Sequence, residues 1–296
     1  MQKDKPKLLI TGAGGQLGRE LARLASDNGE FEFLLADRHT IDIRTHRHVL
    51  DAIGDLAPAA VINCAAYTNV EQAETEPEEA MLANDLGAGY VAEACHKAGA
   101  LLVHFSTDYV FDGNKSAPYR EEDLCAPLSV YGKSKWEGEK KIDMHTQRHF
   151  ILRTSWLYSA YGHNFFKTML RLAKERGELN VVDDQIASPT YAGFLAADVL
   201  TLMKRVLVDR AHVDYGIYHY TQSGETSWYG FATEIIAQSG MQVPVHAVHT
   251  GAFPTKAKRP HYSKLDTTKF ASKTQIAMQP WQEGVRACMA LIRNQV

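Results

Sequence analysis

The amino-acid sequence predicts an α/β fold of the Rossmann type, in which a doubly wound parallel sheet is followed by a smaller C-terminal α/β region. The first observation is that short apolar runs alternate with amphipathic helical stretches, which is the order of βαβ units. The second is a glycine-rich turn between the first apolar run and the first helical stretch. The third is an acidic residue that directly follows the second apolar run.

Residues 7–24 are expected to form the first strand, a tight turn and the first helix. The apolar run 8–10 is followed by Gly12, Gly15 and Gly18 at equal intervals. Glycine permits a tight turn and a close approach of the backbone to a pyrophosphate, which the N-terminus of the next helix attracts. The same triplet also occurs in ordinary glycine-rich turns, so the assignment depends on its context.

The second strand is expected over 31–36 and is followed by Asp37 and Arg38. A carboxylate at this position accepts a hydrogen bond from the free ribose 2′-hydroxyl of a dinucleotide, whereas an adjacent guanidinium pairs with a 2′-phosphate. The turn and the acidic residue together predict a nicotinamide-dinucleotide site. Because both residue types are present, we expect NADPH or NADH to be used, with NADPH modestly preferred.

Further polar or small residues fall at the ends of the following strands. Gly12, Asp37, Ala65 and Thr107 all lie at carboxyl ends of predicted strands, which is the edge where such sheets bind ligands. The elements expected up to this point are a helix over 45–56, a buried strand over 59–66, a helix over 78–98 and a strand over 101–105.

The rest of the chain is more mixed, and prolines are frequent in its final third. We predict a dinucleotide-binding domain over 1–158, with a returning segment near 190–222, and a substrate-binding region over 159–189 and 223–296. The expected elements are helices over 131–144, 164–176 and 192–208, strands over 149–158, 179–182 and 216–221, and a last well-formed helix over 228–239.

Composition excludes several classes of protein. The 296 residues carry a formal net charge of −3 and no run of Lys or Arg, which argues against a nucleic-acid partner. No apolar stretch approaches the roughly 20 residues of a membrane span, and no signal peptide is expected. The 13 histidines show no metal-ligand spacing, so no metal site is predicted.

The four cysteines are scattered along the chain and are expected to be reduced thiols rather than a disulfide framework. This usage predicts a cytoplasmic protein. The sequence does not decide between a monomer and a homodimer.

Tyr131 and Lys135 are four residues apart on a predicted helix, which places both side chains on one face. A phenol with its usual pKa of about 10 is a poor proton donor at neutral pH. An adjacent ammonium is expected to lower the pKa of Tyr131, and Lys135 is also a candidate to hold the nicotinamide ribose. The strand-terminal Thr107 is placed to polarise a carbonyl group. The alternative is a solvated Tyr and Lys on a surface helix.

With these motifs in place, the chain resembles the dTDP-4-dehydrorhamnose reductase family of the extended short-chain dehydrogenases/reductases along most of its length. The stretches that carry the resemblance are TGAGGQLG at 11–18, NCAAYT at 63–68, STDYVFDG at 106–113, PLSVYGKSK at 127–135, RTSW at 153–156, NFFKTML at 164–170, DQ at 184–185 with SPT at 188–190, and RP at 259–260 followed by SKLD at 263–266.

The resemblance implies reduction of the C4 keto group of dTDP-6-deoxy-L-lyxo-4-hexulose to dTDP-L-rhamnose by a reduced nicotinamide. It implies that Tyr131 is the proton donor, that Lys135 assists it, and that Thr107 hydrogen-bonds near the keto oxygen. It places the sugar near Asp108 and Trp156, and Arg259 near the nucleotide sugar. The positions it assigns to the cofactor are Gly15, Gln16, Leu17, Asp37, Asp42, Ile43, Ala65, Ala66 and Tyr67.

Several of these positions have simpler explanations. Trp156 is equally explained as a core residue, Asp42 as a helix cap, and the alanines as small residues for close packing. The chain also departs from the family at one point: some members bind magnesium through glutamates at a dimer interface. Glu20 matches one of these positions, but Gly193 stands where another glutamate is expected.

Two other functions remain open. An epimerase or a 4,6-dehydratase of the same fold is one alternative, although dehydratases typically continue the active-site Thr-Asp with Glu, and here Tyr109 follows. The second alternative is a non-catalytic cofactor-binding regulatory subunit, which would tolerate loss of Tyr131, Lys135 or Thr107.

A basic cluster at 256–259 directly precedes Pro260. This cluster either contacts the substrate diphosphate or is a solvated loop.

Overall fold

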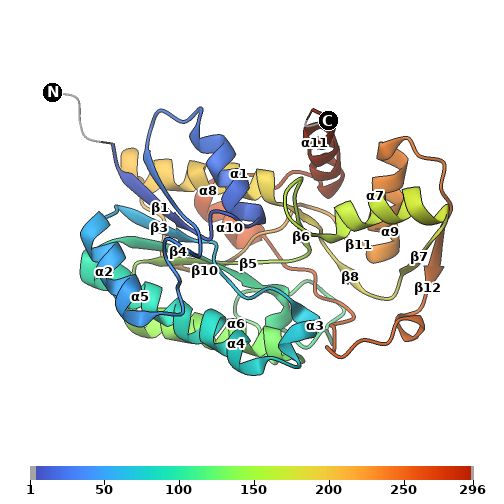
Figure 1. Ribbon diagram of the computed structural model, residues 1–296, viewed down its shortest axis with the longest axis horizontal. Coiled ribbons are helices and arrows are strands. Elements are labelled where there is room, and N and C mark those ends of the chain that lie inside the picture. The colour runs from blue at the N-terminus through green and yellow to red at the C-terminus, as the bar shows by residue number, and fades with distance from the viewer. Residues whose placement is uncertain (1–4, 295–296) are drawn as a thin grey trace.

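The computed structural model describes residues 5–294, and its centre is a six-stranded parallel sheet (Figure 1). Its spatial order is β10-β5-β4-β3-β1-β2. The strands are β1 (Lys7–Thr11), β2 (Glu32–Ala36), β3 (Ala60–Asn63), β4 (Leu101–Thr107), β5 (His149–Thr154) and β10 (Gly216–His219). Every residue of β3 and β5 is buried, as expected for strands covered on both faces. The predicted doubly wound α/β class is confirmed.

The order in which strands are added to the sheet reverses at β1, because β2 and β3 lie on opposite sides of this strand. In the register, Thr11 is the partner of both Ala36 and Asn63, so the carboxyl ends of all three strands meet there. Such a switch point leaves a crevice at the strand ends, since the connections that follow diverge toward opposite faces.

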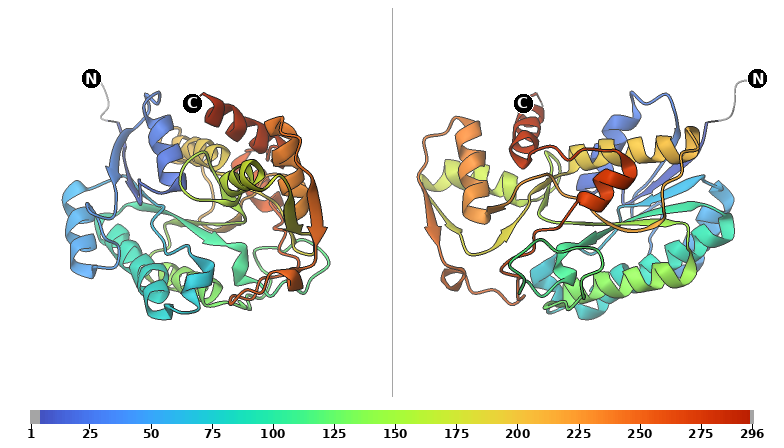
Figure 2. Two further views of the ribbon diagram at one scale, coloured as in Figure 1. Left: turned by 45° about the vertical axis from the view of Figure 1, so that its right-hand side comes forward. Right: turned by 180° about the vertical axis from the view of Figure 1, so that it is seen from behind.

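Helices cover both faces of the sheet (Figure 1, Figure 2). One apolar core lies under α1 (Gln16–Ala25), α8 (Ala192–Met203) and α10 (Thr268–Thr274). The core on the other face is formed with α2 (His46–Leu56), α5 (Gly87–Ala98) and α6 (Val130–His145). Short helices α3 (Val70–Ala73) and α4 (Pro77–Met81), and the π-helical turn η1 (Leu82–Leu86), lead into α5.

A third apolar cluster lies in the part of the molecule drawn at the right of Figure 1. It is formed by α7 (Phe165–Arg176), α9 (Trp228–Ser239) and α11 (Trp281–Arg293), together with paired strands β7 (Leu179–Val182) and β12 (Val245–Val248). Two further pairs join distant segments: β6 (Leu157–Tyr158) with β9 (Thr190–Tyr191), and β8 (Ile186–Ala187) with β11 (Thr226–Ser227). The predicted domain boundaries stay a prediction.

The strand predicted over 149–158 is wrong in its second half. β5 ends at Thr154, and Trp156 adopts a left-handed backbone conformation with φ of +46°. The chain then continues as β6, which pairs with β9 instead of the main sheet. The predicted strand 59–66 is shorter for a similar reason: β3 ends at Asn63, and the next residues turn over the glycine-rich loop. Apolar character continues past the point where pairing stops.

The prediction that 228–239 is the last well-formed helix is also wrong, because α11 follows it. Pro280 is the N-cap of α11, a position where a missing N–H costs nothing, rather than a break. The predicted helix 78–98 runs through α4, η1 and α5, and the helix 192–208 through α8 and the π-helical turn η3 (Lys204–Val208). No helix within residues 5–294 has the length and apolar character to cross a membrane.

Candidate active site

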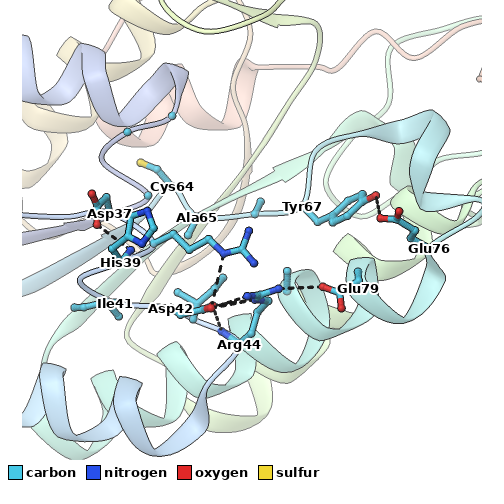
Figure 3. A pocket seen from close by; sticks show the side chains of 17 residues that line it. Asp37, His39, Ile41, Asp42, Arg44, Cys64, Ala65, Tyr67, Glu76 and Glu79 are labelled. Atoms are coloured by element: carbon cyan, nitrogen blue, oxygen red, sulfur yellow. Dashed lines mark hydrogen bonds and ion pairs between the residues drawn. The ribbon is translucent and has the colours of Figure 1, made fainter.

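A cavity of about 690 Å³ opens at the carboxyl ends of β1, β2 and β3 (Figure 3). It lies at the switch point of the sheet, where the sequence predicted a dinucleotide. The predicted cofactor residues that line it are Gly12, Gly15, Asp37, Arg38, Asp42, Ile43, Ala65, Ala66 and Tyr67. Glu76, Glu79 and Ala83 complete the wall, so that four separate parts of the chain meet around one space.

The glycine-rich turn has the geometry that its sequence suggested. Gly12 has φ of +66°, and a Cβ there would lie 2.6 Å from the amide nitrogen of Ala65. A Cβ on Gly18 would clash with the Gly12 carbonyl oxygen, so this glycine lets α1 start directly against the turn. Gly15 caps α1 without a side chain, and the first turn of α1 carries no acidic residue. The helix N-terminus therefore suits an anionic pyrophosphate.

Asp37 and Arg38 stand at the mouth of this cavity, and both are exposed. One carboxylate oxygen of Asp37 accepts hydrogen bonds from the backbone N–H groups of His39 and Thr40 and from the Thr40 hydroxyl. These hydrogen bonds, first those from Thr40, lower the pKa of Asp37. Arg38 lies 3.8 Å from Asp42, with 69% of its side chain exposed, so its guanidinium has freedom to reach a ligand.

Arg44 is a cavity residue that the sequence analysis missed. Figure 3 shows it between Asp42, to which its Nη2 donates over 2.7 Å, and Glu79, to which its Nη1 donates over 3.0 Å. Hydrogen bonding from Arg44 lowers the pKa of Asp42 to about 2. Asp42 is therefore an ion-pair partner in the cavity wall, and Thr45 is the N-cap of α2. The sequence feature that could have revealed Arg44 is its position two residues after Asp42, a carboxylate that was already predicted to belong to the site.

Five residues assigned to the cofactor do not line this cavity: Gln16, Leu17, Gly18, Tyr131 and Lys135. Leu17 is buried in the core beneath α1. Gln16 accepts a hydrogen bond from the Asn164 side chain over 2.8 Å, and Gly18 packs against the turn.

Tyr131 and Lys135 lie on α6, whose N-cap Ser129 accepts a hydrogen bond from the Gly132 amide. Burial raises the pKa of Tyr131 to about 12, although a hydrogen bond with Thr107 acts in the opposite direction. Burial lowers the pKa of Lys135 to about 8, and its Nζ lies 3.1 Å from His104 Nε2. The expected lowering of the Tyr131 pKa by Lys135 is therefore wrong for this arrangement: the shift has the opposite sign.

Thr107 and Asp108 connect the surroundings of Tyr131 to the C-terminal part of the chain. The Thr107 hydroxyl donates to Asp108 over 3.1 Å, and Ser263 donates to the other oxygen of this carboxylate over 2.5 Å. Burial raises the pKa of Asp108 to about 7. Tyr109 lies edge-on to Tyr131, with ring centroids 5.9 Å apart.

A second cavity of about 650 Å³ lies between α7, β7, α9 and the loop before Arg259. Arg259 lines it, donates to Glu71 over 2.6 Å and lies near Tyr109, where its charge opposes the burial that raises the pKa of this tyrosine. Trp228, another lining residue, stacks on Trp156 with ring centroids 3.6 Å apart. Of the lining residues, the sequence analysis assigned only Arg259 to the substrate; Trp156 lies behind Trp228 and does not line the cavity. The residues it missed include Phe165, Met169, Arg176, Asn180, Gln185, Thr250 and Phe253.

The possible magnesium position has no room for a second carboxylate. Glu20 is fully buried, and its oxygens accept hydrogen bonds from Ser159 and Arg23. A Cβ at Gly193 would clash with the ring of Tyr191, which occupies this space. The residues present therefore do not fit the magnesium site of some related enzymes.

A family model described as the RmlD substrate binding domain matches residues 6–294 of this chain. The chain belongs to the RmlD family. It is 47% identical over 286 residues to the dTDP-4-dehydrorhamnose reductase of Aggregatibacter actinomycetemcomitans, which covers 95% of this chain and 97% of that protein. It is 40% identical over 289 residues to the enzyme of that name from Escherichia coli K12, covering 94% of this chain and 95% of that protein.

Solved structures of RmlD-family proteins share the fold. The crystal structure of dTDP-4-dehydrorhamnose reductase from Bacillus anthracis in complex with NADP aligns with a TM-score of 0.91 at 39% identity, over 97% of this chain and 99% of that one. The Clostridium acetobutylicum orthologue also aligns with a TM-score of 0.91, at 38% identity and with the same coverage. The resemblance noted from the sequence motifs is confirmed.

Proposed function

We propose that this chain reduces the C4 keto group of dTDP-6-deoxy-L-lyxo-4-hexulose to a hydroxyl group, which yields dTDP-L-rhamnose. The observation that carries the proposal is that Tyr131 is linked through neighbouring side chains to the walls of both cavities. Its neighbour Lys135 connects through His104 and Asn63 to the wall of the dinucleotide cavity. On the other side, Tyr109 connects Tyr131 to Arg259 in the second cavity.

The residues on α6 and β4 fit the chemistry of a ketone reduction. The bound nicotinamide supplies a hydride to C4, and the keto oxygen takes a proton, so that the carbonyl becomes an alcohol. Tyr131 donates this proton, which the phenol holds at neutral pH both at its usual pKa and at the higher pKa that burial gives it. The Thr107 hydroxyl orients the keto oxygen beside Tyr131, and Lys135 holds the nicotinamide ribose.

The dinucleotide is proposed to bind in the cavity at the switch point as NADPH or NADH. The pyrophosphate contacts the amide groups at the start of α1, behind Gly12 and Gly15. Asp37 accepts from the adenine ribose of NADH, and Arg38 pairs with the 2′-phosphate of NADPH. The rest of the predicted cofactor set comprises Gln16, Leu17, Gly18, Asp42, Ile43, Ala65, Ala66, Tyr67, Tyr131 and Lys135.

The nucleotide sugar is proposed to occupy the second cavity. Aromatic rings such as Trp228 offer an apolar stacking surface for a pyrimidine base, and Arg259 can hold a diphosphate with two hydrogen bonds. Asp108 and Trp156 are proposed to contact the sugar, since both lie beside Thr107 or the cavity wall.

We also propose a cytoplasmic location and a monomer or homodimer that binds no nucleic acid. The four cysteines are free thiols, which supports a reducing compartment. The net charge of −3 supports the absence of a nucleic-acid partner.

A direct assay tests the proposed reaction. Purified protein is mixed with the dTDP-hexulose and with NADPH or NADH, the nicotinamide absorbance is followed, and the product is identified by NMR. We expect cofactor oxidation that depends on the sugar, with dTDP-L-rhamnose as the product. An epimerised sugar formed without cofactor consumption, or no turnover with either nucleotide, contradicts the proposal.

A further inference from the structure

The basic loop 256–259 is docked on the N-terminal part of the chain. Ala257 is 1% exposed, and Pro260, which follows the loop, is buried. Both lysines of the loop are exposed, and of its three basic residues Arg259 alone lines the second cavity. The fold of the loop therefore presents one cation to this cavity and leaves the other two in solvent.

Two contacts fix the backbone that follows Arg259. Gly113 has φ of +76°, and a Cβ on it would lie 2.5 Å from the Cβ of Pro260, so the two backbones approach closely only because this residue is glycine. Three residues further on, Ser263 donates to Asp108 over 2.5 Å. The chain is thus held from Pro260 onward, which leaves the loop itself and the Arg259 side chain to be fixed.

Glu71 of α3 holds the loop at two points. One carboxylate oxygen accepts from Nη2 of Arg259 over 2.6 Å, and the other accepts from the backbone N–H of Lys256 over 2.9 Å. The first of these is a charge-assisted hydrogen bond, the stronger class. A single carboxylate therefore connects the start of the loop to the guanidinium at its end.

The short helix α3 is itself held against the reaction centre. Asn69 is its N-cap and accepts a backbone N–H from the first turn. Glu74, at the other end of α3, accepts from the backbone N–H of Val130, the first residue of α6, over 2.9 Å. Because Tyr131 is the next residue of α6, one short helix contacts both the start of the proposed acid's helix and, through Glu71, the basic loop.

The ion pair with Glu71 does not exhaust the guanidinium of Arg259. The carboxylate engages one nitrogen of a fork that carries several N–H groups, and a diphosphate is recognised by two such groups at once. The opposite role, in which Glu71 competes with the diphosphate for Arg259, is disfavoured. The second oxygen of the same carboxylate holds the loop backbone, so breaking the pair would also release the loop.

We propose that Glu71 is a positioning residue for the nucleotide sugar: it fixes the loop 256–259 and holds the Arg259 guanidinium ready for the diphosphate. A side chain that is ordered before the ligand arrives costs less entropy on binding. This inference rests on the proposed function for the identity of the ligand. The coupling between Glu71 and Arg259 can be measured without turnover.

A double-mutant cycle on dTDP binding tests this coupling. Calorimetry compares the parent protein with Glu71→Ala, Arg259→Ala and the double variant. The Glu71 side chain is 40% exposed, so we expect Glu71→Ala to weaken dTDP binding by only about 3–10-fold. In the double variant it is expected to add nothing to the loss from Arg259→Ala, because it acts through this arginine. Additive losses, or tighter dTDP binding in Glu71→Ala, overturn the proposal.

Glu78→Ala is the matched control, because it removes the same charge from an exposed position of α4 that lines neither cavity. We expect its dTDP affinity to equal that of the parent protein. NADPH affinity is expected to be unchanged in every variant, which shows that the first cavity is folded. Glu71→Gln keeps the size of the side chain and one acceptor oxygen. It is expected to lose less affinity than Glu71→Ala, and it carries the test if the alanine variant does not bind NADPH.

Steady-state kinetics separate positioning from a general structural role. We expect Glu71→Ala to raise the KM for the dTDP-sugar by the same factor as the dissociation constant of dTDP, with kcat nearly unchanged, since saturating sugar orders the loop. A loss of kcat with an unchanged KM indicates a disturbed α6 and overturns the positioning role. If no protein in the series reduces the sugar, the proposed function fails, and the dTDP cycle still decides whether Glu71 acts through Arg259.

Discussion

At the scale of single residues, Tyr131 is the proposed proton donor, and a phenol holds its proton at neutral pH. We predict that Tyr131→Phe keeps NADPH binding and loses turnover by ~10²–10⁴-fold, the usual contribution of a general acid. Fluorescence titration of NADPH and steady-state kinetics measure the two effects separately. Turnover within a few-fold of the parent protein would remove Tyr131 from the acid role.

Arg38 is predicted to discriminate between the two nicotinamide dinucleotides. Its guanidinium is mostly exposed and only loosely paired with Asp42 at 3.8 Å, so it is available to a 2′-phosphate. We expect Arg38→Ala to weaken NADPH binding by roughly 10–100-fold, which is the usual effect of losing a charge-assisted hydrogen bond. The affinity for NADH is expected to stay nearly unchanged. Dissociation constants for both nucleotides check this.

Arg44→Ala is the comparison for this prediction, because Arg44 is already engaged by Asp42 and Glu79. We expect it to weaken both nucleotides together by disordering the cavity wall. Equal losses for NADPH and NADH in Arg38→Ala would show that Arg38 also has a structural role or binds the shared phosphates.

Arg259 is predicted to act on the other substrate. It lines the second cavity and already pairs with Glu71, so its guanidinium is held in place for a diphosphate. We expect Arg259→Ala to raise the KM for the dTDP-sugar by about tenfold or more, with NADPH affinity unchanged. Lys258→Ala removes a charge from an exposed position of the same loop and serves as the control. Weaker cofactor binding with an unchanged KM for the sugar would contradict the assignment.

The residues that the sequence could predict are those whose role depends on local geometry. The glycines of the turn, Asp37 at a strand end and the Tyr131–Lys135 pair are all readable from spacing. The ion pairs of Arg44 and the contact between Lys135 and His104 were not, because they depend on which side chain lies opposite in the folded chain. The direction of the Tyr131 pKa shift failed for the same reason: Lys135 is near enough in sequence, but it points to His104.

At the scale of elements, the contact between α6 and the π-helical turn η1 positions one wall of the dinucleotide cavity. Asn84 of η1 hydrogen-bonds with both backbone groups of Tyr67 and with Ser134 of α6. Gly138 of α6 lies against the Asn84 carbonyl oxygen, with no room for a Cβ. The close approach of the two helices thus determines where the Tyr67 segment sits.

We predict that Gly138→Ala destabilises the protein by ~1–3 kcal/mol through overpacking and also weakens NADPH, because Asn84 must shift. Gly54→Ala is the opposite case: Gly54 lies in α2 with open space around it, and alanine there is expected to stabilise by ~0.5–1 kcal/mol. Chemical denaturation measures both free energies of unfolding. Similar stability changes in the two variants would contradict the packing argument.

Element prediction from sequence succeeded where periodicity extends over several turns, as in α6, α7 and α9. It failed at short strands such as β8 and β11, because two residues show no alternation. The π-helical turns were invisible for a different reason. An extra residue in one turn leaves the apolar pattern helical, and only the backbone hydrogen bond from the Gly87 N–H to the Leu82 carbonyl oxygen reveals it.

At the scale of the whole molecule, the two cavities are built from different sets of segments. The first is lined by segments 12–15, 37–44, 64–67 and 76–83, all from the N-terminal part of the chain. The second is lined by 165–185, Trp228 and 250–259. Hydrogen bonds from Ser263 to Asp108 and from Arg259 to Glu71 join the parts beside the proposed reaction centre. The sequence indicated three of the four segments that line the first cavity but not the segment 76–83, and the second cavity is assembled only by tertiary packing.

This arrangement predicts two separate ligand footprints in amide hydrogen exchange. A ligand slows exchange in the segments that open less often when it is bound, so protection marks its site. We expect NADPH to protect 12–17, 37–44 and 64–67, and dTDP alone to protect 165–182 and 250–259. Arg259→Ala is expected to lose the dTDP footprint and keep that of NADPH. If dTDP instead protects the segments around the glycine-rich turn, both ligands share the first cavity, and the proposed division of the chain into cofactor and substrate regions is wrong.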